Sequence, residues 1–166
     1  MSRSFAIAVL LVAPPATTVR ADDAAERAAR FYQRIGARVV RDEGVAGRPV
    51  VELDLSYARA TDDDLEHLSG LPHLQVLNLS YSTVTGTGLR HAAGLKHLRD
   101  LDLSHTKLRD ADLKPLAGVL ELRRLHLGAT LVSDAGLRHL VELDHLAELD
   151  LSKTLVTGPA WSIWAG

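Results

Sequence analysis

Apolar residues recur along the chain with a period of 24 positions. In residues 98–121 they stand at Leu98, Leu101, Leu103, Leu108, Leu113, Leu116 and Val119. Copies of the same pattern begin at Val50, Leu74, Leu122 and Leu146, and the last copy is incomplete. A fixed period of this length indicates a repeat protein, in which each unit packs mainly against its neighbours.

The spacing of apolar positions changes within each unit. Leu101 and Leu103 alternate with polar residues, which is the spacing of a strand. Leu113 and Leu116 are three positions apart, which is typical of a helical turn. Each unit is therefore predicted to be a strand of about five residues followed by a turn and a short helix. Because one unit cannot bury both apolar sides alone, we expect stacked units with parallel strands and internal columns of leucine.

Four segments carry one common motif. They are LQVLNLSYSTVTGTGL (74–89), LRDLDLSHTKLRDADL (98–113), LRRLHLGATLVSDAGL (122–137) and LAELDLSKTLVTGPA (146–160). The shared pattern LxxLxLSxTxVTDxGLxxLxxLxx resembles a leucine-rich repeat, most closely the 24-residue bacterial subtype of exported proteins. The resemblance covers about residues 50–160 and implies an α/β fold: a right-handed solenoid with a parallel sheet on its concave face and short helices on its convex face.

The resemblance also implies a structural role for one row of hydroxyl side chains. Ser82, Thr106, Thr130 and Thr154 fall where other leucine-rich repeats carry an asparagine ladder. Their hydroxyls are expected to bond to neighbouring backbone at the turn.

The first 21 residues are typical of a secretory signal peptide. Arg3 is followed by the apolar run Phe5–Ala13, and Val19 and Ala21 are the small residues around a predicted cleavage site. We therefore expect export to the periplasm, the cell envelope or the medium; the alternative is an N-terminal helix of a cytosolic protein. The run is too short to span a bilayer as a permanent helix, so no integral membrane segment is expected after cleavage.

Residues 22–49 are predicted to cap the first repeat. A helix is expected to begin at Asp22 or Asp23 and to end at Gly36, followed by a strand over 37–42 and a loop over 43–49. One face of this helix is apolar and consists of Ala28, Phe31, Tyr32 and Ile35. A cap would cover the first leucine layer. The alternative is a separate peptide-binding helix.

The repeat domain is assigned to residues 50–166. Its units are 50–73, 74–97, 98–121, 122–145 and the partial unit 146–166. In the last unit Trp161 and Trp164 replace leucines, so the tail is either a lid over the last leucine layer or a loose substitute for a truncated repeat. Both interpretations leave the strand 146–151 with an unpaired edge, and a homodimer through that edge is a hypothesis.

Composition narrows the functional classes further. The chain has 46% hydrophobic residues, a net charge of −2 and no cysteine. These values favour one domain with a sizeable core, and no basic patch indicates a nucleic-acid partner. Without cysteine there is no disulfide, no thiol catalysis and no cysteine-based zinc site. No cofactor is expected.

Function is expected on the concave face, where side chains next to the inward leucines point outward. The candidate ligand-binding residues are Glu52, Asp54, Tyr57, Asn78, Tyr81, Asp100, Asp102, Arg124, His126, Glu148 and Asp150. Most of the charged members are acidic, with Arg124 and His126 set between carboxylates, which favours a partner with basic groups. Aromatic anchors such as Tyr57 and Tyr81 suit a protein interface.

Two sharper hypotheses concern the same residues. Asp102, His126 and Asp150 could bind a divalent metal ion, and Ser104 with His126 and Asp150 could mimic a nucleophile–base–orienter set. The preferred interpretation is a solvated charge ladder of little energetic weight. A flat open sheet offers neither a water-excluded pocket nor oxyanion donors, so no enzymatic activity is expected.

The sequence therefore predicts a non-catalytic module that binds a protein or peptide through its concave face. The alternatives are a carbohydrate or cell-envelope ligand, a metal-dependent site, and the repeat domain of an F-box-type effector. The last is disfavoured because no F-box segment precedes the repeats in this sequence.

Overall fold

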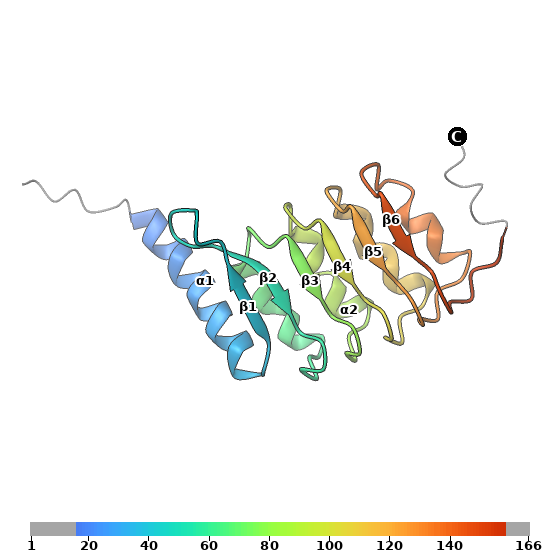
Figure 1. Ribbon diagram of the computed structural model, residues 1–166, viewed down its shortest axis with the longest axis horizontal. Helices are drawn as coiled ribbons and strands as arrows, with labels where there is room; N and C mark the ends of the chain where they lie inside the picture. The colour runs from blue at the N-terminus through green and yellow to red at the C-terminus, as the bar shows by residue number, and fades with distance from the viewer. Residues whose placement is uncertain (1–15, 159–166) are drawn as a thin grey trace, which may run out of the picture.

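The computed structural model describes residues 16–158, which form a sheet with helical segments along one of its faces (Figure 1). Six strands lie in chain order: β1 (Arg38–Arg41), β2 (Val50–Asp54), β3 (Val76–Asn78), β4 (Asp100–Asp102), β5 (Arg124–His126) and β6 (Glu148–Asp150). The helical segments are α1 (Ala16–Arg34), η1 (Asp63–Gly70), α2 (Gly86–Leu89), η2 (Ala92–Gly94), η3 (Asp110–Gly118) and η4 (Gly136–Leu140). β1 is antiparallel to β2, and strands β2 to β6 are parallel.

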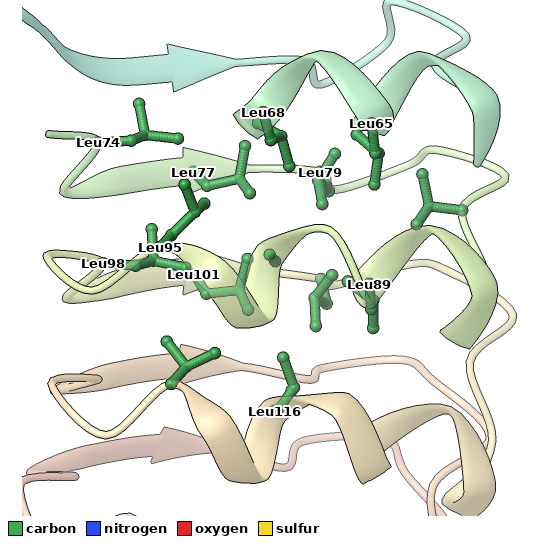
Figure 2. Packing of buried hydrophobic residues seen from close by; sticks show 14 of the residues in the cluster. Leu65, Leu68, Leu74, Leu77, Leu79, Leu89, Leu95, Leu98, Leu101 and Leu116 are labelled. Atoms are coloured by element: carbon green, nitrogen blue, oxygen red, sulfur yellow. The ribbon is translucent and has the colours of Figure 1, made fainter. Parts of the chain in front are cut away.

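The predicted leucine columns are confirmed. Leu53, Leu77, Leu101, Leu125 and Leu149 pair directly across neighbouring parallel strands. Figure 2 shows leucines from the strands and from the helical segments meeting in the space between them. In the four complete units, every apolar position of the 24-residue pattern is buried. A register shift of one residue would turn the whole column to the other face, so the pattern fixes the stacking.

The last unit is less well covered than the others. Leu146, Leu149, Leu151 and Val156 are only partly buried, although they pack against the core. Within residues 16–158, β6 pairs only with β5, so its other edge has no strand partner. The predicted lid of Trp161 and Trp164 lies outside the described residues.

The local geometry within a unit differs from the prediction in two respects. Strands β3 to β6 are three residues long rather than about five, and the return path is mostly 3₁₀-helix rather than α-helix. The 3₁₀-helix has three residues per turn, so it aligns leucines three positions apart, such as Leu65 and Leu68, toward the core. The residues after each strand enter a turn, which ends the pairing early.

The N-terminal helix begins earlier than predicted. α1 starts at Ala16, not at Asp22 or Asp23, so it extends into the segment assigned to the signal peptide. No glycine or proline interrupts the sequence between Ala16 and Arg34, whereas two prolines stand just before it. The helix ends as predicted, because Gly36 adopts a left-handed conformation with φ of 94°.

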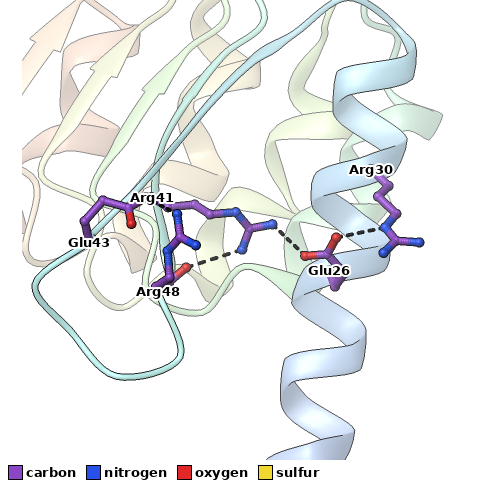
Figure 3. A network of polar contacts seen from close by, with 5 residues as sticks. All are labelled: Glu26, Arg30, Arg41, Glu43 and Arg48. Atoms are coloured by element: carbon purple, nitrogen blue, oxygen red, sulfur yellow. Dashed lines mark hydrogen bonds and ion pairs between the residues drawn. The ribbon is translucent and has the colours of Figure 1, made fainter.

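α1 and β1 cover the first repeat, as predicted for a cap. Tyr32 is fully buried, and its hydroxyl donates a hydrogen bond of 3.0 Å to the carbonyl oxygen of Asp64 in η1. This burial raises the pKa of Tyr32 well above its ordinary value. Figure 3 shows how Arg41 of β1 reaches Glu26 of α1, at 2.7 Å, and ties the two elements together. The described part of the chain holds no helix with the length and apolar character required to cross a membrane.

Carboxylates on the turn side of the stack join neighbouring units in a way the sequence analysis missed. One aspartate accepts both a backbone N–H and a hydroxyl hydrogen bond from the residue 23 positions later. The pairs are Asp62 with Thr85, Asp110 with Ser133, and Asp134 with Thr157, at 2.5–2.9 Å. We call this arrangement the carboxylate clasp.

The second unit lacks the clasp aspartate and uses another residue instead. Gly86 stands at that position, and Asp112 of the following unit accepts the backbone N–H groups of Gly86, at 3.0 Å, and Arg109, at 2.8 Å. A Cβ on Gly86 would lie 2.7 Å from Oδ1 of Asp112, so the glycine leaves room for this carboxylate. Each junction between the repeat units thus contains one aspartate that bonds across it, supplied from one unit or the other.

Candidate functional site

The candidate site is the side of the sheet opposite the leucine core, which we call the open face. Two rows of side chains run across it in strand register. The first row is Glu52, Val76, Asp100, Arg124 and Glu148, and the second is Asp54, Asn78, Asp102, His126 and Asp150. Nine of the eleven predicted residues therefore lie on adjacent strands, and Tyr57 and Tyr81 follow in the turns after β2 and β3.

The first row contains two ion pairs. Arg124 contacts Oδ2 of Asp100 through Nη2 at 2.6 Å and through Nε at 2.8 Å. The hydrogen bond and the charge of Asp100 raise the pKa of Arg124. At the other end of the row, Arg38 of β1 pairs with Glu52. These two ion pairs neutralise part of the negative charge that the sequence predicts for this row.

The second row has a structural role that the sequence analysis did not foresee. Oδ1 of Asp54, Asn78, Asp102 and Asp150 accepts the backbone N–H of the serine two residues later, at 2.8–2.9 Å. Such a bond forms an Asx turn, in which the side chain replaces a backbone acceptor and ends the strand. These side chains therefore shape the turn that carries the residues beyond them.

The turn after β6 affects the ionisation of Asp150. The backbone N–H of Ser152 donates a hydrogen bond to its carboxylate and lowers the pKa of Asp150, and the Ser152 hydroxyl and His126 act in the same direction. His126 differs from the rest of the row, because no hydrogen bond joins its ring to another of the residues 16–158.

The metal and catalytic hypotheses are not supported by this geometry. Among the described residues, no three His, Asp or Glu side chains lie close enough to hold a metal ion, so Asp102, His126 and Asp150 do not form the required cluster. The carboxylates of Asp102 and Asp150 are turned toward the N–H groups of their own turns. In the same part of the chain, no hydrogen bond links Ser104, His126 and Asp150 as a catalytic set would require.

Beyond the two rows, exposed rings form a continuous stack at the turns. Tyr57 and Tyr81 have ring centroids 4.8 Å apart and an interplanar angle of 16°. Tyr81 and His105 follow at 4.3 Å and 8°. Tyr57 and Tyr81 are 71% and 48% exposed. We call these three residues the ring ladder.

The backbone of the ring ladder is in a conformation that non-glycine residues rarely adopt. Tyr57, Tyr81 and His105 have φ values of 62°, 59° and 58°, and Ala129 and Lys153 follow with 56° and 58°. Each left-handed residue with a side chain costs roughly 1–2 kcal/mol relative to a relaxed conformation. Glycine would avoid this cost. The same conformation recurs at Ala129 and Lys153, so it belongs to the repeated turn, and none of the five positions is a glycine.

The sequence analysis predicted Tyr57 and Tyr81 and missed His105 as a site residue. His105 stands 24 positions after Tyr81, so the repeat period alone could have added it. Its N–H donates to the carbonyl oxygen of Gly128 at 2.8 Å, and that of Tyr81 donates to Ser104 at 3.0 Å. These bonds extend the strand register into the turns and keep the rings aligned.

Comparisons with known proteins agree with this fold. The leucine rich repeat family profile matches residues 48–108. The crystal structure of internalin C2 from Listeria monocytogenes is 30% identical in sequence with a TM-score of 0.54, covering 63% of this chain and 43% of that one. A pollen receptor kinase 3 structure is 18% identical with a TM-score of 0.53, covering 80% and 73%, and supports the fold alone. No match is found among curated proteins.

The chain thus has a leucine-rich repeat solenoid fold. It spans less than half the length of the internalin C2 chain that it matches. Leucine-rich repeat domains are usually non-catalytic and typically mediate protein interactions.

Proposed function

We propose that the protein is a non-catalytic interaction module that binds a protein or peptide on its open face, with the ring ladder as the main anchor. The observation that carries this proposal is the stack of Tyr57, Tyr81 and His105, exposed at the edge of a rigid sheet. Aromatic side chains held in one orientation lose little entropy on binding and are common energetic centres of interfaces. The typical use of this fold in protein recognition supports the same conclusion.

The charges of the open face favour a partner segment with basic groups beside its anchor. Asp100 and Glu52 are paired with arginines, while Glu148 has no ion pair among residues 16–158. Asp102 and Asp150 add carboxylates to the same face, and each accepts a backbone N–H from its own turn. Complementary charge at such a rim would raise the association rate more than the affinity.

A selection from a displayed random peptide library, with the full chain immobilised, tests the proposal. The selected peptides are expected to bind the wild type and to lose at least about tenfold in affinity for the double variant Tyr57→Ala/Tyr81→Ala. The matched control is Arg90→Ala/Lys114→Ala on the helical side of the stack, which should leave the affinity unchanged. If all selected peptides bind the tyrosine double variant as well as the wild type, the open face is not the binding surface.

Export and self-association are separate proposals. The pattern of Met1–Ala21 supports cleavage by a signal peptidase after Ala21, which would remove 16–21 from α1 and retain Tyr32 in the cap. Mass spectrometry of the protein recovered from an exporting host would give its first residue.

The free edge of β6 supports a homodimer, and sedimentation that finds only monomer at micromolar concentration would contradict it.

A further inference from the structure

The ring ladder stops at His105, two units before the end of the sheet. Ala129 stands at the position of Tyr57, Tyr81 and His105, with the same left-handed backbone and a φ of 56°. Its N–H donates to the carbonyl oxygen of Ser152 at 2.8 Å, so this turn is in register with its neighbours. The alanine side chain ends at Cβ, so no ring of the described residues continues the stack at this level. We call this level, beside Ala129, the open rung.

The missing ring leaves a space of defined width. Consecutive rings of the ladder are 4.8 and 4.3 Å apart, close to the strand spacing. His105 lies one unit before Ala129 and Lys153 one unit after it. Two strand spacings, roughly 9–10 Å, therefore separate the levels of His105 and Lys153. One planar ring fits between them at ordinary stacking distance on both sides.

The neighbouring position does not widen this space. Gly128 is buried, because the side chains of the next unit lean over it: a Cβ there would lie 2.9 Å from Oδ2 of Asp150 and 3.1 Å from Oγ of Ser152. The open rung is thus confined to Ala129, which is partly exposed, between two exposed side chains.

The side chains that flank the rung are suited to an electron-rich ring. One face of the His105 ring contacts Tyr81, so its other face is directed toward the level of Ala129. Lys153 on the opposite side carries an ammonium group, which is attracted to the face of tryptophan or tyrosine. Stacking on one face and a cation on the other would hold an inserted indole or phenol ring.

We propose that the partner inserts a single tryptophan or tyrosine side chain at Ala129, between His105 and Lys153, and so completes the ring ladder. This inference rests on the proposed function, since it assigns the anchor of the same binding surface.

Variants in which residue 129 itself supplies a ring test the inference, because that ring would occupy the space proposed for the partner's side chain. Ala129→Tyr and Ala129→His both continue the ladder with a residue that the chain already uses at this position. Either one is expected to lower the affinity for the selected peptides at least about tenfold. Ala129→Ser keeps the rung open and should leave the affinity unchanged, and a thermal melt of each variant shows whether the fold is intact. Unchanged affinity in a folded Ala129→Tyr variant overturns the inference.

The peptides themselves provide the reciprocal test. Replacing their aromatic residue by leucine should abolish the difference between wild type and Ala129→Tyr. In NMR spectra, N-acetyl-tryptophanamide should shift the Ala129 methyl signal upfield in the wild type and not in the variant His105→Ala. Peptides without any aromatic residue that still depend on Tyr57 and Tyr81 would overturn the inference and leave the proposed function intact.

The chain's own tryptophans must also be tested as occupants. Both tryptophans, Trp161 and Trp164, lie outside the described residues. If Ala129→Tyr changes the tryptophan fluorescence of the free protein, the rung is filled by this chain and the inference is wrong. Unchanged fluorescence, together with lost peptide affinity, supports a ring from the partner.

Discussion

At the scale of the residue, the ring of Tyr81 can be examined separately for its contribution to folding and its contribution to binding. Tyr81 gains from stacking on two rings, at about 0.5–1.5 kcal/mol each, and loses roughly 1–2 kcal/mol through its backbone conformation. The two contributions nearly cancel. Stability alone would therefore permit glycine here, and the proposed binding role of the ring ladder gives a reason for tyrosine.

Substitution of Tyr81 by glycine and by alanine measures this balance. Both variants lose the stacking, but only Tyr81→Gly also relieves the left-handed backbone. Tyr81→Gly is expected to unfold in urea with a free energy within about 1 kcal/mol of the wild type, and Tyr81→Ala to be about 1 kcal/mol less stable than Tyr81→Gly. A Tyr81→Ala variant more stable than Tyr81→Gly would contradict the assigned conformation.

Asp150 gives the turn after β6 a dependence on pH. Its pKa is lower in the folded protein than in the unfolded chain, because the Ser152 N–H stabilises the carboxylate. Its contribution to stability is therefore complete above the pKa of a free aspartate, about 3.9, and is lost as the pH falls through the lower folded value. An NMR titration should give an Asp150 pKa below 3.9 with the Ser152 amide signal moving in parallel.

Asp150→Asn is the matched control for this titration. The amide oxygen can still accept the Ser152 N–H, as Asn78 accepts that of Ser80 in the second unit. The variant should keep the turn at neutral pH, and the acid-induced shift of the Ser152 signal should disappear. A shift that persists in Asp150→Asn would assign the titration to another group.

At the scale of the element, the carboxylate clasp explains why aspartate and glycine alternate between two repeat positions. Opposite Asp62 and Asp110 the next unit has a glycine, Gly88 and Gly136, that faces the carboxylate. A Cβ on Gly136 would lie 2.7 Å from Oδ1 of Asp110. Where the clasp residue is itself a glycine, at Gly86, the next unit supplies Asp112. At each of the first three junctions, a glycine makes room for the single carboxylate that bonds across it.

Removal of the clasp at the third junction should destabilise the stack measurably. Asp110→Ala leaves the N–H and hydroxyl of Ser133 without their acceptor and is expected to cost about 1–3 kcal/mol in urea unfolding. Asp144→Ala, at an exposed aspartate for which no hydrogen bond is found within 16–158, should change stability by less than about 0.5 kcal/mol. Equal effects of the two substitutions would refute a role for the clasp.

A double-mutant cycle measures the coupling between the clasp residue Asp110 and the glycine that faces it, Gly136. Gly136→Ala is expected to destabilise the wild type by about 1–3 kcal/mol through overpacking against Asp110. In the Asp110→Ala background the same change should cost less, because the clashing carboxylate is absent. Additive effects would show that the two positions do not interact.

The sequence predicted the features that repeat and missed those that depend on a partner elsewhere in the chain. Leucine at fixed positions determined the strand register and the core, because a shift would expose a whole column. The clasp was missed because Asp110 bonds to Ser133, 23 residues away, and the role passes to Asp112 at another junction. The ligand role assigned to Asp102 neglected a bond to its own turn, which competes at close range for the same carboxylate.

The same contrast holds within the candidate site. Tyr57 and Tyr81 were predicted as binding residues because they are aromatic residues beside a polar face. Ala129 could not be found in this way, since an alanine carries no chemistry and becomes informative only when its neighbours on both sides are placed in space.

At the scale of the whole molecule, each layer of leucines is stabilised by the layers on both sides of it. Leu125 lies in the interior of the column and is fully buried, whereas Leu149 forms its C-terminal end within residues 16–158 and is partly exposed. The same side chain at the same repeat position therefore differs only in its place in the stack. Burial on both sides should dominate its contribution to stability.

Truncation of these two leucines tests that view. Leu125→Ala is expected to lower the free energy of unfolding by about 3–5 kcal/mol, because it leaves a cavity that neighbouring layers cannot fill. Leu149→Ala should cost about half as much or less, since part of that side chain is in contact with water in the wild type. Urea unfolding followed by circular dichroism measures both values.

If Leu149→Ala costs as much as Leu125→Ala, the last layer is covered in solution, either by the residues after 158 or by a second copy of the chain. Sedimentation of the wild type at the same concentration then distinguishes these two sources of cover.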